Sequence, residues 1–408
     1  MEIGTVISTN DTPNTQSFYF VATKEGRVKK GLFIETNTSE GLLMGRIEEI
    51  IKANRYFMQP ETISSYEESI NLHFPTDEWE FIVCKVHCLG ILNENVRKSN
   101  YPVSPGEVVR MANKENLKKL FRFDDNGLNL GKLISHELEV KINLNKLFQK
   151  HLAILALSGA GKSYAACVLI EELINRKAEN GKVGVLIIDP HGEYTSFAYD
   201  ERFHKGVNLI KGRDMRIGLT NLSSYYYKLF LPNLSFAQER DLNKAIKELK
   251  KRNDVFGIRE IIYKIENEEN IKQATKDVLL SNLDALHSLK LFGYYDVPNL
   301  NNLISPGKIS ILDISEITSE KKKQMIVAYF LRELFNKRVK RKIAPFIAFI
   351  EEAHNFAPEK SSKENFSKKI IEKIAREGRK FNALLCLISQ RPVHLSTTSL
   401  SQCNTHMY

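Results

Sequence analysis

The sequence lacks any long uncharged apolar run. Its 408 residues are 42% hydrophobic, but no stretch approaches the roughly 18 to 20 apolar residues that span a bilayer. The first residues, MEIGTVISTNDTP, carry neither the basic nor the apolar segment of a secretion signal. We therefore expect a cytoplasmic protein with no membrane partner, large enough to form two or three domains.

Cysteine is scarce and scattered. Five cysteines are an odd number in a chain too large to need disulfide staples, which favours a reducing compartment. Cys84 and Cys88 enclose His87 at a spacing that invites a metal site, but the matching second ligand pair of a zinc site is missing. Because they lie in EFIVCKVHCLG, whose alternation predicts a strand, we interpret them as buried thiols.

The excess of positive charge is modest. Lys and Arg number 59 against 49 Asp and Glu, a net charge of +10, which favours anionic partners such as nucleic acid. Much of this excess lies in runs at 321–323 and 337–342. Such runs are typical of solvated helix faces, so the charge alone assigns no lysine to DNA.

The pattern of the chain changes along its length. Residues 1–142 are short alternating segments broken by turn residues, which predicts a small β-barrel. Residues 143–222 and 301–408 contain short continuous apolar runs separated by helical patterns, as in a parallel sheet covered on both faces. Residues 223–300 have helical periodicity and predict a helical insertion. Its apolar stripes include Leu242, Ala245, Ile246, Leu249, Ile271, Val278, Leu279 and Leu286.

Five apolar runs share one feature, which is that each ends on polar residues. The runs are 152–157, 183–188, 309–312, 346–350 and 383–388. In an open parallel sheet the carboxyl ends of the strands meet at one edge, where ligands bind. We therefore expect the residues after these runs to form one site.

The first run leads into a phosphate-binding loop. Residues 156–163 read ALSGAGKS, a Walker A motif whose small residues let successive backbone N–H groups point at phosphate oxygens. Lys162 is expected to bridge the outer phosphates of ATP, and the Ser163 hydroxyl to ligate Mg²⁺. A chance loop is a poor alternative, because a strand precedes the motif and a helix follows it. The predicted nucleotide-binding residues are Ser158, Gly159, Ala160, Gly161, Lys162, Ser163 and Tyr164.

Two acids follow the fourth run, in FIAFIEEAH. Glu351 is predicted to hold Mg²⁺ through water, and Glu352 to polarise the water that attacks the γ-phosphate. The alternative for such a pair is a solvated loop.

The second and fifth runs offer further polar groups. The second leads into DPHGEY, whose tip can lie beside the P-loop strand if the sheet is ordered as in most P-loop proteins. Asp189 could then ligate the metal, and His191 or Glu193 could reach the phosphates or the attacking water. The alternative is a capped turn in which Gly192 takes a positive φ. After the fifth run, Gln390 is placed to sense the γ-phosphate.

A cation is also needed to neutralise charge that develops on the γ-phosphate. Arg376 and Arg379 lie at the end of a helix that Gly378 can terminate as its C′ residue, and from there a guanidinium can project into a neighbouring subunit. The alternative is a surface arginine at a helix end. The buried stripe of this helix is Phe366, Ile370, Ile371 and Ile374.

A single P-loop is present, and only 56 of the 408 residues follow Glu352. That is too few for a second domain to close the site, as tandem-domain helicases do. We therefore expect a homo-oligomer in which neighbouring subunits complete the site.

Together these motifs resemble the HerA branch of the HerA and FtsK superfamily. ALSGAGKS, DPHGEY, IEEAHNFAP, IAREGRKF and SQRP occur in that family's order, and the β-rich N-terminal region looks like its HAS-barrel. The similarity extends over nearly the whole chain. The combination of DPHGEY with EEAHNF and AREGRK is highly specific.

The resemblance implies an α/β fold with a RecA-like P-loop ATPase core, a helical insertion and a small N-terminal β-barrel. It also implies a hexameric ring that uses ATP and Mg²⁺ to pull duplex DNA through its channel, in DNA end processing or antiviral defence. A nuclease or effector subunit, NurA-like or SIR2-like, would be its partner. The family's roles carry onto Lys162, Ser163, Glu351, Glu352 and Gln390, and onto Arg376 or Arg379 as the arginine lent to the neighbour.

This sequence departs from the family pattern in two ways. Ala156 and Glu351 stand where Gly and Asp are commoner, and both changes are chemically tolerable. The chain also ends at THMY, where related proteins continue through another strand and a C-terminal arm. Either the sequence is a fragment or the protein is a trimmed relative, and we expect ring stability to be the property affected.

Two other functions compete with a motor. A nucleotide-switched ring platform would assemble and activate an effector without processive translocation. A monomeric GTPase switch is disfavoured because the sequence contains no NKxD or TKxD motif for reading guanine.

Overall fold

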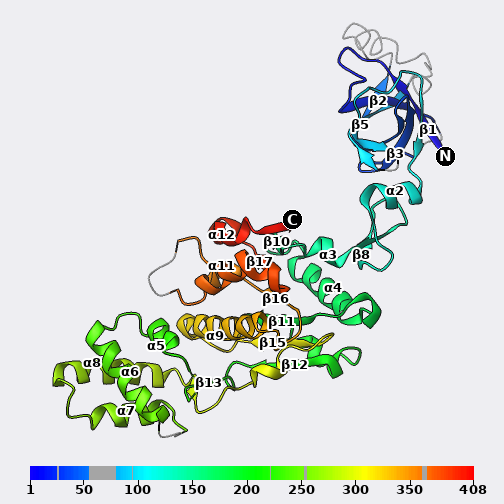
Figure 1. The fold of residues 1–408 in the computed structure, drawn as a ribbon. Coiled ribbons are helices and arrows are strands. Elements are labelled where there is room, and N and C mark those ends of the chain that lie inside the picture. The colour runs from blue at the N-terminus through cyan, green and yellow to red at the C-terminus, as the bar shows by residue number, and fades with distance from the viewer. Residues whose placement is uncertain (25–26, 55–79, 94, 221, 252–254, 361–364) are drawn as a thin grey trace, which may run out of the picture. The chain divides into compact units, whose positions relative to one another are not determined.

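The computed structural model describes residues 1–24, 27–54, 80–93, 95–220, 222–251, 255–360 and 365–408. They form two compact units, Met1–Asn143 and Leu144–Tyr408 (Figure 1). No helix within these ranges is both long and apolar enough to cross a bilayer.

The first unit is built on a closed six-stranded barrel. The strand order is β2-β1-β7-β3-β4-β5, and β2 also pairs with β5, which closes the sheet. Alternate side chains such as Phe18 and Phe20 point inward and are fully buried, as the alternation predicted. The strands are β1 (Glu2–Ile7), β2 (Ser17–Ala22), β3 (Phe33–Thr38), β4 (Gly41–Asn54), β5 (Glu80–Leu92) and β7 (Val108–Met111), with β6 (Val96–Arg97) paired to the end of β5.

The strand predicted around Cys84 and Cys88 is confirmed as part of β5. Cys84 is buried and Cys88 is half-buried, and burial raises the pKa of the two thiols to about 11 and about 12. Both are therefore neutral thiols at physiological pH. A small subdomain of α2 (Lys114–Phe121), β8 (Leu128–Lys132) and β9 (Glu139–Ile142) completes this unit.

The second unit is a parallel sheet with helices on its faces (Figure 1). Its order is β12-β15-β11-β16-β17-β10-β18, and the strands formed by the five predicted apolar runs are almost wholly buried. The strands are β10 (His151–Leu155), β11 (Gly184–Asp189), β12 (Val207–Lys211), β15 (Ile309–Asp313), β16 (Phe346–Ile350), β17 (Ala383–Ser389) and β18 (Cys403–Met407). The principal helices are α4 (Lys162–Asn175), α9 (Glu320–Val339) and α11 (Lys368–Glu377).

The strand order corrects one prediction. The end of β11, where DPHGEY begins, does not lie beside the P-loop strand β10, because β16 and β17 separate the two strands. The strand next to β10 on this side is β17, which ends at Ser389 just before Gln390. The acids after β16 are thus separated from the P-loop by a single strand.

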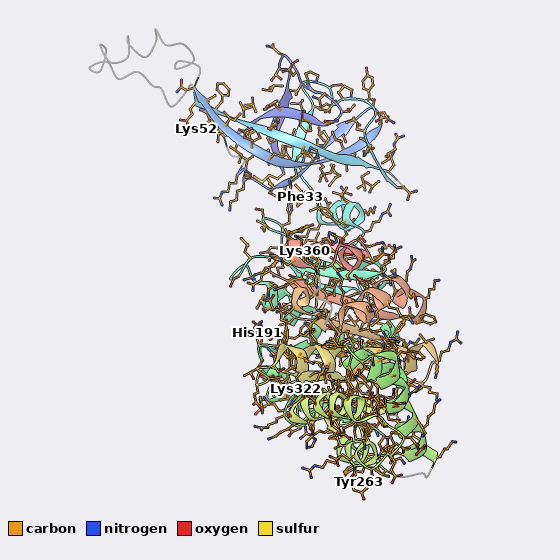
Figure 2. The ribbon with its side chains drawn as sticks, turned by 90° about the vertical axis from the view of Figure 1, so that its left-hand side faces the viewer. Phe33, Lys52, His191, Tyr263, Lys322 and Lys360 are labelled. Atoms are coloured by element: carbon orange, nitrogen blue, oxygen red, sulfur yellow. The ribbon has the colours of Figure 1, made fainter. Side chains whose placement is uncertain are left out.

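Four helices fill the segment where an insertion was expected. They are α5 (Ser224–Phe230), α6 (Phe236–Lys251), α7 (Ile258–Glu266) and α8 (Gln273–Ser288), and they lie between the paired strands β13 (Ile217–Gly218) and β14 (Phe292–Gly293). The stripe from Leu242 to Leu249 on α6 is buried. On α8 the prediction was partly wrong, because Val278 is 43% exposed and the buried face runs through Leu279, Leu283 and Leu286. Tyr263 projects from α7 at the surface (Figure 2).

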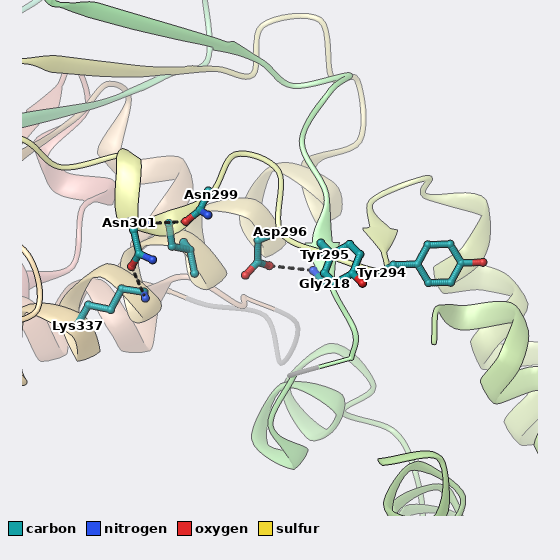
Figure 3. A pocket seen from close by; sticks show the side chains of 8 residues that line it. Gly218, Tyr294, Tyr295, Asp296, Asn299, Asn301 and Lys337 are labelled. Carbon is teal, nitrogen blue, oxygen red and sulfur yellow. Dashed lines mark hydrogen bonds between the residues drawn. The ribbon is translucent and has the colours of Figure 1, made fainter. Parts of the chain in front are cut away.

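A pocket of about 260 Å³ lies at the base of this insertion (Figure 3). Its polar groups bond to one another: the Asp296 carboxylate accepts hydrogen bonds from the Gly218 amide at 2.9 Å and the Tyr329 hydroxyl at 2.7 Å. Lys337 donates to the Asn301 side chain at 2.8 Å. Because α9 carries Tyr329 and Lys337, these bonds fasten the base of the insertion to the core.

The predicted role of Gly378 as a left-handed C′ residue is wrong. Its φ and ψ are −59° and −34°, and the chain continues from α11 as a tight turn, Gly378–Phe381, before Asn382 takes the left-handed conformation with a φ of 52°. Glycine is required for a different reason. A Cβ at this position would lie 2.1 Å from the Ala383 carbonyl oxygen, so only glycine allows this close return of the backbone.

Candidate active site

The P-loop connects β10 to α4, which begins at Lys162. Gly159 and Gly161 have φ values of 81° and 88°, a conformation that residues with a Cβ rarely adopt. Among the described residues, no side chain caps the first turn of α4 at Gly161. The backbone amides of this turn are therefore available for phosphate oxygens, and the loop fits the polyphosphate of ATP.

The loop lysine meets both acids of the FIEEAH segment. The Lys162 ammonium contacts the Glu351 carboxylate directly and lies 3.9 Å from Oε1 of Glu352. All three side chains are nearly buried, with 9%, 0% and 7% of their surface exposed. A solvated loop, the alternative for the two acids, is therefore wrong. Each carboxylate is partly neutralised by the same cation.

Glu351 has a second partner that the sequence did not indicate. The Tyr194 hydroxyl donates a hydrogen bond of 2.6 Å to its Oε2 atom, and Tyr194 is fully buried. Burial and the adjacent carboxylate raise the pKa of Tyr194, so the phenol remains protonated and donates. No local pattern could have identified this contact, because the two residues are 157 positions apart.

Asp189 organises the turn that carries Tyr194. Its Oδ1 accepts backbone hydrogen bonds from His191, Gly192 and Glu193, and its Oδ2 accepts one from the Tyr194 amide at 2.9 Å. Gly192 has a φ of 78°, so the capped turn is present. Burial raises the pKa of Asp189, although these four bonds oppose the shift. Both carboxylate oxygens of Asp189 already accept hydrogen bonds from backbone amides. The role of Asp189 as a metal ligand stays a prediction.

The other polar residues of DPHGEY point outward. His191 is exposed (Figure 2), and Glu193 is exposed as well. The turn nevertheless comes close to α4. Burial, together with the carboxylates of Glu171, Glu193, Glu351 and Asp189, raises the pKa of the Cys167 thiol on α4 to about 11. The field of Glu193 therefore extends to the helix that begins at the P-loop.

Glu352 adopts an unusual backbone conformation. Its φ and ψ are 48° and 47°, in the left-handed region, which costs a residue with a side chain about 1 to 3 kcal/mol. Strain of this kind clusters at functional sites. Its Oε2 atom lies 3.1 Å from Nδ1 of His354, in the short helix α10 (Ala353–Phe356). His354 was not among the predicted site residues.

Gln390 follows β17 at the same edge of the sheet. The register pairs Leu155 of the P-loop strand with Ser389, and the Ala156 amide donates to the Ser389 carbonyl at 3.4 Å. Gln390 therefore lies beside the start of the P-loop, and its side chain is half-buried.

Arg376 and Arg379 lie at the opposite edge of the sheet. Both are exposed and precede the amino end of β17, whereas the P-loop and the acids follow the carboxyl ends of their strands. A strand of the length of β17 spans about 20 Å, which is longer than an arginine side chain. The arginines of one chain therefore lie far from the P-loop of that chain.

Comparisons with known proteins agree with these motifs. A family model described as the central domain of helicase HerA matches residues 128–334. The DNA double-strand break repair helicase HerA of Pyrococcus furiosus is 26% identical over 95% of this chain and 80% of its own. A probable helicase of Methanocaldococcus jannaschii is 31% identical over 92% of this chain and 75% of its own.

Similarity to solved structures is more distant. The bacterial conjugative coupling protein TrwB has a TM-score of 0.48 and 12% identity, over 73% of this chain and 77% of its own. A likeness of that size does not inform on function. The sequence similarity to helicases is decisive here: the chain belongs to the HerA helicase family and is an ATP-hydrolysing P-loop enzyme.

Proposed function

We propose that this chain is one subunit of a ring-shaped motor, a hexamer by resemblance, that hydrolyses ATP to move along DNA, with duplex DNA as its track. The observation that carries the proposal is the meeting of Lys162, Glu351 and Glu352 at one edge of the sheet, with Arg376 and Arg379 at the other. The names of the HerA relatives, which are helicases of DNA double-strand break repair, supply the DNA substrate.

In this proposal the P-loop amides and Lys162 bind the β- and γ-phosphates of ATP. Mg²⁺, when bound with ATP, would be held by the Ser163 hydroxyl and Glu351 and would offset phosphate charge. Glu352 accepts a proton from the water whose oxygen attacks the γ-phosphorus. The bond from that phosphorus to the β–γ bridging oxygen breaks, and ADP leaves. Gln390 contacts the γ-phosphate from the neighbouring strand.

The position of the arginines supports a shared site. Neighbouring subunits stacked head to tail around a ring bring the amino edge of one sheet toward the carboxyl edge of the next. Arg376 or Arg379 then enters the next subunit's site and stabilises the charge that develops during hydrolysis. Closure of the ring is thus part of catalysis.

The cellular role belongs to the same proposal. We place the motor in the cytoplasm, with a nuclease or effector subunit, NurA-like or SIR2-like, in DNA end processing or antiviral defence. The competing function is a ring platform that uses ATP only to assemble such an effector.

DNA-stimulated turnover distinguishes the two functions. For a motor, linear duplex DNA should raise the steady-state ATPase rate several-fold, because each step along DNA is coupled to one hydrolysis cycle. The measurement is phosphate release with and without duplex, with single-stranded DNA of equal length as the comparison. A slow rate that is indifferent to both DNAs, together with ATP-dependent assembly of an effector, would favour the platform.

Replacing Tyr194 by Phe should weaken the use of Mg²⁺. The change removes one hydrogen bond to Glu351 and leaves the packing of the aromatic side chain unaltered. Loss of such a supporting bond typically costs about 10-fold or more in metal affinity or activity. We expect a roughly tenfold higher Mg²⁺ concentration for half-maximal ATPase, with a smaller change in kcat at saturating Mg²⁺. Tyr199→Phe, at an exposed tyrosine a few residues on, is the matched control. An unchanged Mg²⁺ dependence would show that Tyr194 serves packing alone.

A further inference from the structure

His354 lies between the Glu352 carboxylate and the carboxyl end of β17. Its Nδ1 atom lies 3.0 Å from the Ser389 hydroxyl, at the end of β17, and 3.1 Å from Oε2 of Glu352. The ring is nearly buried. One nitrogen therefore faces both the proposed general base and the strand that leads into Gln390.

The Glu352 carboxylate has an unsatisfied oxygen. Oε2 is buried, and among the described residues it accepts no hydrogen bond of good geometry, although His354 Nδ1 is near. A buried carboxylate oxygen without a partner is costly. The atom is therefore ready to accept a hydrogen bond, either from His354 or from a water.

A neutral His354 can serve only one of its two neighbours at a time. Burial lowers its pKa, and the nearby cations Arg391 and Lys162 lower it further, so the imidazole carries a single N–H at neutral pH. The Ser389 oxygen already accepts the Arg391 amide at 3.0 Å, so it can either donate its own proton to Nδ1 or accept a second bond. Donation from Nδ1 to Glu352 therefore depends on which hydrogen bond the same nitrogen makes with Ser389.

We infer that His354 is a positioning residue that joins the Glu352 carboxylate to Ser389, so that displacement of β17 changes the orientation of Glu352. The inference rests on the proposed role of Glu352 as general base. Its consequence is that a γ-phosphate bound by Gln390, one residue beyond Ser389, acts on the base through a chain of two side-chain contacts.

Two substitutions at His354 test the Nδ1 atom itself. Asparagine places its amide nitrogen near the position of Nδ1, whereas glutamine reaches the position of Nε2. We expect His354→Asn to keep kcat within about threefold and His354→Gln to lower it roughly tenfold or more, since a hydrogen bond to a charged group is lost. The KM for ATP and the dissociation constant of a non-hydrolysable ATP analogue should change little in both. Equal kcat values for the two variants would overturn the inference.

Ser389 provides an independent test, because replacing serine by alanine is a small change that the fold should tolerate. Ser389→Ala should lower kcat, and His354→Gln combined with Ser389→Ala should lose no more than His354→Gln alone, because the two residues act as one unit. Losses that multiply would overturn the link. In nucleotide-free protein labelled with ¹⁵N-histidine, Ser389→Ala should also shift the His354 ring signals, and unchanged signals would contradict the contact. Melting temperatures establish that each variant is folded.

Failure of this inference is distinguishable from failure of the proposed function. If Glu352→Gln abolishes turnover while His354→Gln matches the parent enzyme, only the role of His354 is wrong. If Glu352→Gln retains turnover, the general base has been misassigned, and the inference falls with it.

Discussion

Glu352→Gln should bind ATP and fail to hydrolyse it. The amide has the size of the carboxylate but cannot accept a proton from the attacking water, and loss of a general base lowers kcat by roughly 10²- to 10⁴-fold. Lys162 and the P-loop are untouched, and Lys162 keeps its contact with Glu351. The measurements are single-turnover hydrolysis of ATP and equilibrium binding of ATP. We expect the dissociation constant for ATP to change less than threefold.

The control for lost charge is Glu266→Gln, at an exposed residue of α7, which should hydrolyse ATP at the parent rate. Retained hydrolysis in Glu352→Gln would reassign the base. Glu193 is then the next carboxylate to replace, because its charge contributes to the field at Cys167 on α4. A loss in Glu193→Gln together with retained hydrolysis in Glu352→Gln would identify that residue as the base.

The parts of this site that follow from local sequence were predictable. Lys162 follows a buried strand and begins a helix, and Glu351 and Glu352 follow another buried strand, so the sequence alone located them at strand ends. Their meeting was also expected, because the ends of parallel strands share an edge. What a local pattern does not contain is the order of strands across the sheet, which is set by tertiary packing.

Two contacts were missed for that reason. Tyr194 contacts Glu351 and His354 contacts Ser389, and both contacts form only when distant strands are in place. Gly378 was assigned to a helix cap by its position after a helix, yet it is required where the backbone passes close to Ala383. In each case the sequence identified the element, and the fold determined what the residue touches.

Arg379→Ala should lose hydrolysis on its own and regain part of it when mixed with Lys162→Ala. An arginine supplied to a neighbouring phosphate site is worth about 10³- to 10⁵-fold in kcat in the best-studied NTPases, so each variant alone should be close to inactive. In a ring mixed at equal ratio, about a quarter of the interfaces pair an intact P-loop with an intact arginine. Hydrolysis at those interfaces, measured across mixing ratios, should pass through a maximum near equal amounts.

Two comparisons make this experiment decisive. Arg376→Ala, mixed in the same way, determines which arginine enters the neighbouring site, and Lys380→Ala, an exposed cation beside Arg379, should keep activity without mixing. Native mass spectrometry must detect rings that contain both variants. If such rings form and no mixing ratio restores hydrolysis, neither arginine completes the phosphate site of the neighbouring subunit. Recovery would mean that one chain holds the phosphate and the next completes the chemistry, so that hydrolysis around the ring is coupled from subunit to subunit.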